Sequence, residues 1–237
     1  MKRLRDFGKR LALCLLGLVP GMWLGWVYAP ELLEVLVQPL LESLKRVGLD
    51  PKIHLSLPLE QTIAHMKIAI FTGVVANVPW TAWQMWGFLS TGMDARRRWR
   101  YAIGFSASST LFFGGGVMFA FTIVIPFVLG SFTMSGPMHG GPSMLSEYLT
   151  FVTRTLLAFG GLFEIPVVVT TVYAAGIATW KRLLALGSWW VPVAAFLSAL
   201  VTPPDVGSQL LFLVPAVLLY FGSAVLARFV VPSLAVE

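Results

Sequence analysis

A single carboxylate, Glu164, lies inside a long apolar stretch of this chain. Its nearest charged neighbours are Arg154, ten positions before it, and Lys181, seventeen positions after it. A charged side chain near the centre of a membrane helix costs about 2.5–3.5 kcal/mol on insertion scales, so Glu164 is a candidate functional residue. The alternative is a protonated structural glutamate that hydrogen-bonds a neighbouring helix, and the residues alone leave both open.

Two glycines, Gly160 and Gly161, precede Glu164 by four and three positions. In a helix they lie on the same face as the glutamate. Small residues let a second helix approach closely. We therefore expect the carboxyl group to face protein rather than lipid.

A second polar group follows the next apolar stretch, in the segment from Thr202 to Gln209. Pro203 and Pro204 are expected to end one helix, and Asp205 is well placed as the N-cap of the next. Turn chemistry accounts for the prolines and the aspartate but not for Gln209. Gln209 and the glutamate are therefore predicted to form an intramembrane polar site.

Composition defines the class of protein around these residues. The 237 residues are 57% hydrophobic and 12% charged, with a mean hydropathy of +0.80, which is typical of membrane proteins. The net charge of +6 comes from basic residues scattered in short gaps between apolar stretches, so it does not indicate nucleic acid. One cysteine, Cys14, allows no disulfide framework, and the histidines lack ligand spacing. We expect no metal and no cofactor.

The elements that must position these residues are helices, and the expected fold class is an all-α membrane protein. Hydropathy predicts six spans in a single membrane domain covering residues 1–237, near 11–28, 66–89, 101–129, 148–178, 183–202 and 207–230. Every span contains a proline, which favours kinked helices in an open, concave bundle. Residues 31–44 are predicted to form an amphipathic helix at the outer interface. The first span is longer than a signal-peptide core and is expected to be retained.

Basic residues predict the orientation of the spans. Twelve of the 17 lysines and arginines fall at the N-terminus, in residues 96–100, at 181–182 and at 228. The positive-inside rule then places both termini in the cytoplasm. Apart from the terminal Glu237, the only acids on that side are Asp6 and Asp94.

Four motifs carry a family resemblance. They are Gln38-Pro39-Leu40, Gln84-x-Trp86-x-Phe88, Ala158-Phe159-Gly160-x-x-Phe163-Glu164-x-Pro166 and Thr202-Pro203-Pro204-Asp205-x-x-Ser208-Gln209. Together they resemble TatC, the multispanning subunit of the twin-arginine (Sec-independent) protein translocase, and the resemblance covers nearly the whole chain.

The resemblance implies a six-helix protein of the bacterial or archaeal cytoplasmic (inner) membrane, with both termini in the cytoplasm. It implies binding of twin-arginine signal peptides on folded precursors, homo- or hetero-oligomers, single-span partners of the TatA and TatB type, and use of the proton-motive force, without enzymatic activity. The residues that match its signal-recognition segments are Asp6, Arg10, Asp94 and Arg98. The residues that match its structural motifs are Pro39, Phe88, Phe159, Gly160, Phe163, Pro203, Pro204 and Asp205.

This chain also departs from the family pattern. Gly8 replaces an arginine near the N-terminus, and Arg97 replaces a glutamate before Arg98. Two guanidinium groups are best matched by carboxylates, which leaves Asp6 and Asp94 and predicts weak capture of signal peptides. A TatC paralogue that assembles without reading twin arginines is therefore an alternative. A small-solute transporter is a further alternative, disfavoured by the proline hairpin and the lack of internal repeats.

Overall fold

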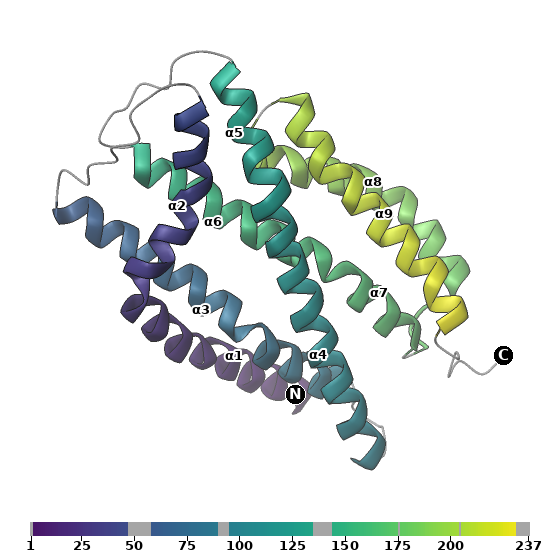
Figure 1. The fold of residues 1–237 in the computed structure, drawn as a ribbon. Helices are drawn as coiled ribbons and strands as arrows, with labels where there is room; N and C mark the ends of the chain where they lie inside the picture. The colour runs from purple at the N-terminus through teal and green to yellow at the C-terminus, as the bar shows by residue number, and fades with distance from the viewer. Residues whose placement is uncertain are drawn as a thin grey trace.

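Long apolar segments form helices because lipid offers no hydrogen-bond partner to the backbone. The computed structural model describes residues 2–46, 58–89, 95–134, 144–174, 176–203 and 205–230. Its elements are α1 (Lys2–Val27), α2 (Ala29–Arg46), α3 (Pro58–Leu89), α4 (Ala95–Phe119), the π-helix η1 (Ala120–Val124), α5 (Ile125–Met134), α6 (Met144–Phe163), α7 (Ile165–Ala174), α8 (Trp180–Val201) and α9 (Val206–Val230). Figure 1 shows their arrangement.

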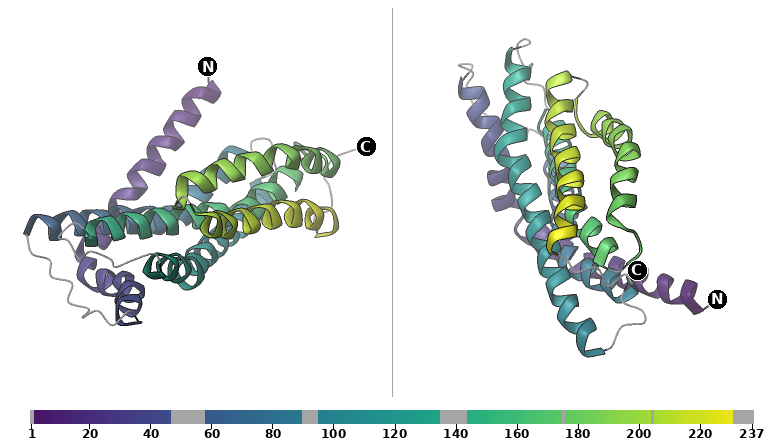
Figure 2. Two further views of the ribbon diagram at one scale, coloured as in Figure 1. Left: turned by 90° about the horizontal axis from the view of Figure 1, so that it is seen from above. Right: turned by 90° about the vertical axis from the view of Figure 1, so that its right-hand side faces the viewer.

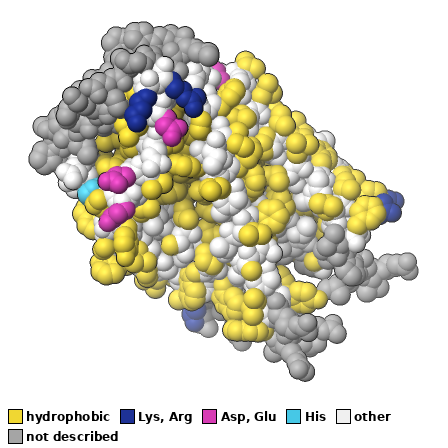
Figure 3. Space-filling model, in the orientation of Figure 1, with side chains coloured by type: hydrophobic (Ala, Val, Ile, Leu, Met, Phe, Trp, Pro, Cys, Tyr) yellow, Lys and Arg dark blue, Asp and Glu magenta, His cyan; other side chains and the backbone are white. Residues whose placement is uncertain are grey.

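Six segments of the described chain are long and apolar enough to cross a membrane. They are Gly8–Val27, Glu60–Gly87, Tyr101–Ser131, Leu145–Ala174, Trp180–Val201 and Val206–Phe229. The predicted number of spans, six, is therefore confirmed. Hydrophobic side chains cover most of the face in Figure 3, with charged groups gathered near its edges.

The helix expected at residues 31–44 is present as α2. Its apolar face is buried at Leu36, Val37, Leu40 and Leu44. Tyr148 of α6 donates its hydroxyl hydrogen to the carbonyl of Leu36 at 2.7 Å. Apolar burial and this hydrogen bond together hold α2 against the spans.

Glycines bring α1 and α3 into close contact. A Cβ added to Gly21 would lie 3.0 Å from the Cα of Gly73, so the two backbones touch. Asn77 donates to the carbonyl of Cys14 at 3.0 Å, and the Trp80 indole donates to that of Leu13 at 3.1 Å. Figure 2 shows α1 leaning away from the other spans toward its N-terminus. α3 is therefore the main support of α1.

A proline coincides with an interruption of the helix in two of the six spans. Pro126 has no N–H and crowds the preceding turn, and just before it the N–H of Ile125 donates to Ala120 five residues back, as in a π-helix. Pro166 similarly follows the break between α6 and α7 at Glu164. The other four, Pro20, Pro79, Pro192 and Pro215, lie inside continuous helices.

Aromatic side chains join α8 to α9. Trp190 stacks on Tyr220 with ring centroids 5.6 Å apart and donates to the carbonyl of Ala216 at 3.0 Å. A Cβ on Gly187 would overlap the ring of Phe221. Phe221 thus fills a contact between these helices.

Candidate functional site

Glu164 lies at the joint between α6 and α7 rather than within a continuous helix. Its N–H donates to the carbonyl of Gly161 at 3.2 Å, and its own carbonyl accepts from Val168 at 3.0 Å. The half-buried carboxyl group accepts a hydrogen bond at 2.8 Å from the Ser109 hydroxyl of α4. Because Ser109 is only 4% exposed, this hydrogen bond links two spans within the protein. The carboxyl group therefore faces protein.

Two glycines set the distance between α4 and α6. A Cβ on Gly160 would lie 2.7 Å from the ring of Phe113, and one on Gly116 would overlap the carbonyl of Phe159. Gly161 has nothing within 4 Å of its added Cβ. The expectation that both glycines before Glu164 meet a second helix therefore holds for Gly160 alone.

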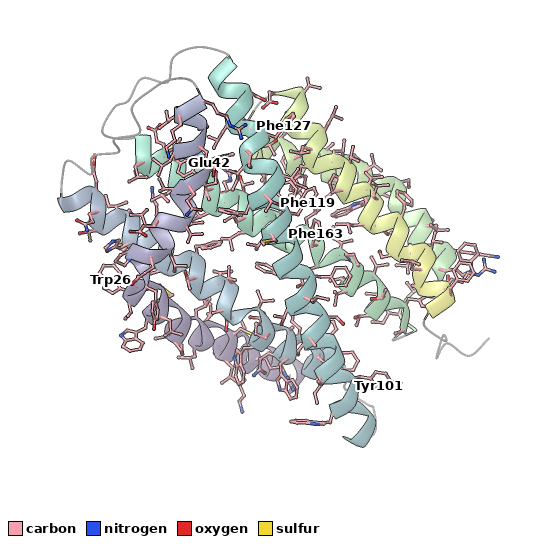
Figure 4. All side chains as sticks on the ribbon, in the orientation of Figure 1. Trp26, Glu42, Tyr101, Phe119, Phe127 and Phe163 are labelled. Carbon is pink, nitrogen blue, oxygen red and sulfur yellow. The ribbon has the colours of Figure 1, made fainter. Side chains whose placement is uncertain are left out.

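Aromatic rings fill the space behind this contact. Phe119 lies with its ring centroid 5.8 Å from that of Phe159 and 5.6 Å from that of Phe163. Figure 4 shows Phe119 and Phe163 close together between α4 and α6. Phe159 is fully buried, so the aromatic residues of this motif have a packing role in the fold.

A crevice of about 610 Å³ lies between the end of α3, the first half of α4, α7 and the second half of α9. Its lining residues are Trp86, Tyr101, Gly104, Phe105, Ser108, Phe112, Pro166, Val167, Thr170, Thr171, Ala174, Leu218, Leu219, Gly222, Ser223 and Leu226. Ser108 precedes Ser109 directly in α4, and Pro166 follows Glu164 by two positions. The Glu164–Ser109 pair therefore lies beside this crevice.

The wall of the crevice is mostly apolar. The hydroxyl of Thr170 donates to the carbonyl of Pro166 at 2.6 Å, and that of Thr171 donates to Val167 at 2.6 Å. These groups are thus satisfied by their own helix. Near the end of α3, Trp86 lies 5.5 Å from Phe105, measured between ring centroids. The crevice is suited to an apolar segment of a ligand, with aromatic rings at one end.

The polar hairpin lies elsewhere in the fold. Asp205 caps α9 by accepting from the Ser208 N–H at 2.7 Å and from the Ser208 hydroxyl at 2.5 Å. Gln209 follows, half-buried in the first turn of α9, and no described hydrogen bond joins it to Glu164. Gly207, two positions before Gln209, packs on Phe127, whereas Glu164 is bonded to Ser109, 18 positions earlier in the same span. The two residues predicted to share one polar site therefore occupy separate places.

The cap makes the hairpin sensitive to acid. The side-chain and backbone hydrogen bonds from Ser208 hold the pKa of Asp205 below its ordinary value of 3.8. A lowered folded pKa contributes stability above the unfolded pKa, and this contribution is lost as the pH falls through the folded pKa. We expect Asp205→Ala to lose about 1 kcal/mol of stability at neutral pH and to show a flatter stability profile as the pH falls to 3.8 and below.

Thermal unfolding in detergent at several pH values checks this expectation. Asp205→Asn is the matched control, because asparagine also caps helices but does not titrate. It should retain most of the stability at pH 7 and lose the acid response. If Asp205→Ala loses stability in acid as the parent does, Asp205 is not the cause of the acid sensitivity.

The residues expected to read the signal peptide (Asp6, Arg10, Asp94 and Arg98), and three of those expected in the structural motifs (Pro39, Phe88 and Pro204), are only partly described. Arg10 donates from Nη1 to the carbonyl of Gln84 on α3 at 3.1 Å. The backbones of Asp6, Phe88 and Arg98 belong to helices α1, α3 and α4, but their side chains lie outside the described ones. Asp94 and Pro204 lie outside the described residues, and Pro39 lies within α2.

Sequence reasoning missed two residues of these sites. Ser109 belongs to the run Ser106-Ala107-Ser108-Ser109-Thr110, and this cluster of hydroxyls within an apolar span was a usable signal. Gly87 lies beneath the guanidinium of Arg10. No local pattern indicates it, because the contact depends on how α1 crosses α3.

Comparisons with known proteins agree with this arrangement. The family model for Sec-independent protein translocase protein (TatC) matches residues 2–215. The Sec-independent protein translocase protein TatC of Xylanimonas cellulosilytica is 32% identical over 227 residues, which cover 94% of this chain and 80% of that relative. The TatC of Aquifex aeolicus is 30% identical over 233 residues, covering 96% of this chain and 93% of that relative.

Other matches differ in extent. A TatC of Halothiobacillus neapolitanus is 32% identical over 166 residues, and the match covers 69% of this chain but 45% of that relative. A crystal structure described as twin arginine translocase receptor TatC has a TM-score of 0.76 and 27% identity, and the match covers 96% of this chain and 98% of that one. The similarity therefore extends over nearly all of this chain.

Proposed function

Because this chain belongs to the TatC family of Sec-independent protein translocase proteins, we propose that it binds signal peptides of folded precursors. It is a multi-pass membrane component of a translocase and not an enzyme. It would assemble with single-span partners of the TatA and TatB type, as homo- or hetero-oligomers, in the cytoplasmic membrane. Export would be driven by the proton-motive force.

The crevice is the observation that best supports this proposal. A signal peptide joins a basic segment to an apolar segment of about 7–15 residues. The apolar segment suits the wall formed by α4, α7 and α9. The basic segment would meet Asp6 and Asp94, which the sequence places near the start of α1 and just before α4. Trp86 near the end of α3 and Tyr101 in α4 line the crevice, and Asp94 lies between these two residues in the sequence.

Filling the crevice tests the proposal. Gly104 and Gly222 line it from two helices, and an added Cβ on either has nothing within 4 Å. We expect Gly104→Leu with Gly222→Leu to abolish export of a twin-arginine reporter in cells that lack their own receptor and carry the cognate partners. Gly114→Leu is the matched control, because Gly114 is equally open but does not line the crevice.

The outcomes separate two functions. Export by the parent and by Gly114→Leu, but not by the filled variant, supports signal-peptide binding in the crevice. Normal export by the filled variant contradicts it. A parent that assembles with its partners but captures no signal peptide would support the paralogue, an alternative favoured by the absence of acidic residues from the first turn of α4.

We also propose that both termini face the cytoplasm. Positive residues orient spans toward that side, and Arg96, Arg97 and Arg98 follow the same pattern in the first turn of α4. Single cysteines at Lys45 and Ala95, made in a Cys14→Ser background, report the two sides by labelling with an impermeant reagent. In intact cells, only the cysteine at position 45 should be labelled. Labelling of the cysteine at position 95 would show that the protein has the opposite orientation.

A further inference from the structure

Arg10 lies against the last turns of α3. Its Nη1 donates to the carbonyl of Gln84 at 3.1 Å. The guanidinium rests on the backbone of Gly87, where an added Cβ would lie 2.9 Å from Arg10 Cζ and 3.2 Å from Nη2. The hydrogen bond therefore holds the guanidinium, and the missing side chain of Gly87 leaves room for it.

The position is electrostatically favourable. The C-terminal end of a helix carries a partial negative charge from its unpaired carbonyl groups. α3 ends at Leu89, two residues after Gly87. Arg10 thus supplies, from another helix, the cation that α3 lacks in its own last turn, which contains no basic residue.

The residues of this contact lie close in the sequence to the two candidate recognition acids. Asp6 precedes Arg10 by one helical turn in α1, and the chain that leads to Asp94 begins where α3 ends. A shift of α1 along α3 would change the separation of these two segments. Recognition of two adjacent guanidinium groups requires the acids at a fixed separation.

We propose that Arg10 is a positioning residue: it fixes the N-terminal turns of α1 on the end of α3 over Gly87, and does not itself contact the signal peptide. This rests on the proposed function of signal-peptide binding. It assigns to Gly87 the role of leaving room for the guanidinium, which an added Cβ would displace.

The remainder of α1 is held independently of Arg10. Gly21 packs on Gly73, and the side chains of Asn77 and Trp80 bind carbonyl groups of α1. Gly87→Ala should therefore leave the chain folded and the α1–α3 pair intact. Only the end of α1 that precedes these contacts should move.

The first measurement needs no signal peptide. Spin labels at Lys9 and Met85, both exposed, report the distance between the ends of α1 and α3 in a Cys14→Ser background. Gly87→Ala and Arg10→Ala should each shift or broaden the distance distribution, whereas Gly114→Ala should not, because an added Cβ at Gly114 meets nothing within 4 Å. An unchanged distribution in Gly87→Ala overturns the proposal.

The second measurement is binding of a twin-arginine signal peptide to the full chain with its partners. We expect Gly87→Ala to weaken binding about tenfold, which is about 1.4 kcal/mol. Arg10→Ala should weaken it equally, and the double variant should be no weaker than either single one. Additive losses, or crosslinking of the peptide to a photoreactive residue at position 10, would show that Arg10 contacts the peptide. If the parent binds no peptide, the proposed function fails, while the label distances still test the positioning.

Discussion

Glu164→Ala is expected to lower stability by about 1–3 kcal/mol, because Ser109 loses the acceptor of its buried hydroxyl hydrogen. The loss of stability should be about 1 kcal/mol, because the hydroxyl of a helical serine can instead donate to the carbonyl four residues back. Glu164→Gln keeps a side-chain oxygen within reach of Ser109. It should preserve the fold and part of the export activity.

A double-mutant cycle isolates this hydrogen bond. Ser109→Ala leaves the carboxyl group beside an apolar surface and should destabilise the chain by a similar amount. The double variant should lose less than the sum of the single variants, because neither partner is then left unpaired. Unfolding in detergent and export of a reporter give the two readouts. If Glu164→Ala assembles and exports like the parent, the site beside the crevice has no role and Glu164 is merely tolerated.

The second large effect is expected at the cytoplasmic recognition surface. Asp6→Asn combined with Asp94→Asn should abolish signal-peptide binding, because these are the only acids predicted on that surface apart from the terminal Glu237. Arg97→Glu should tighten binding, since it adds a carboxylate and removes a repelling charge. It also places an acid in the first turn of α4, where the helix dipole favours negative charge by about 0.3–1 kcal/mol.

Crosslinking of a twin-arginine signal peptide to the parent and to these variants at two salt concentrations measures both effects. Binding through exposed charges should weaken as salt rises. Arg182→Glu is a matched control, because it makes the same change of charge in another predicted cytoplasmic segment. If none of these substitutions changes crosslinking of the signal peptide, the peptide is recognised by other residues. If the parent does not bind the signal peptide and Arg97→Glu does, the result would favour a TatC paralogue that does not read twin arginines.

The sequence alone determined the features that depend on neighbouring residues. Six apolar stretches predict six spans because each helix satisfies its own backbone in lipid. The N-cap at Asp205 follows from its distance to Ser208, three residues away, and needs no other helix. The family could be inferred from motifs that are contiguous in the chain. The structure confirmed the number of spans and the cap for this reason.

Tertiary structure decided how the spans meet. The carboxyl group of Glu164 is paired with Ser109, 55 positions away, and Arg10 with the carbonyl of Gln84, 74 positions away. The periodicity of apolar residues shows that one face of a helix is buried. It does not show which helix packs against that face, or at which residues. Those choices depend on close approach at particular glycines, such as Gly87 and Gly160. The separation of Gln209 from Glu164, and the crevice between α4 and α9, follow from that packing and from no local pattern.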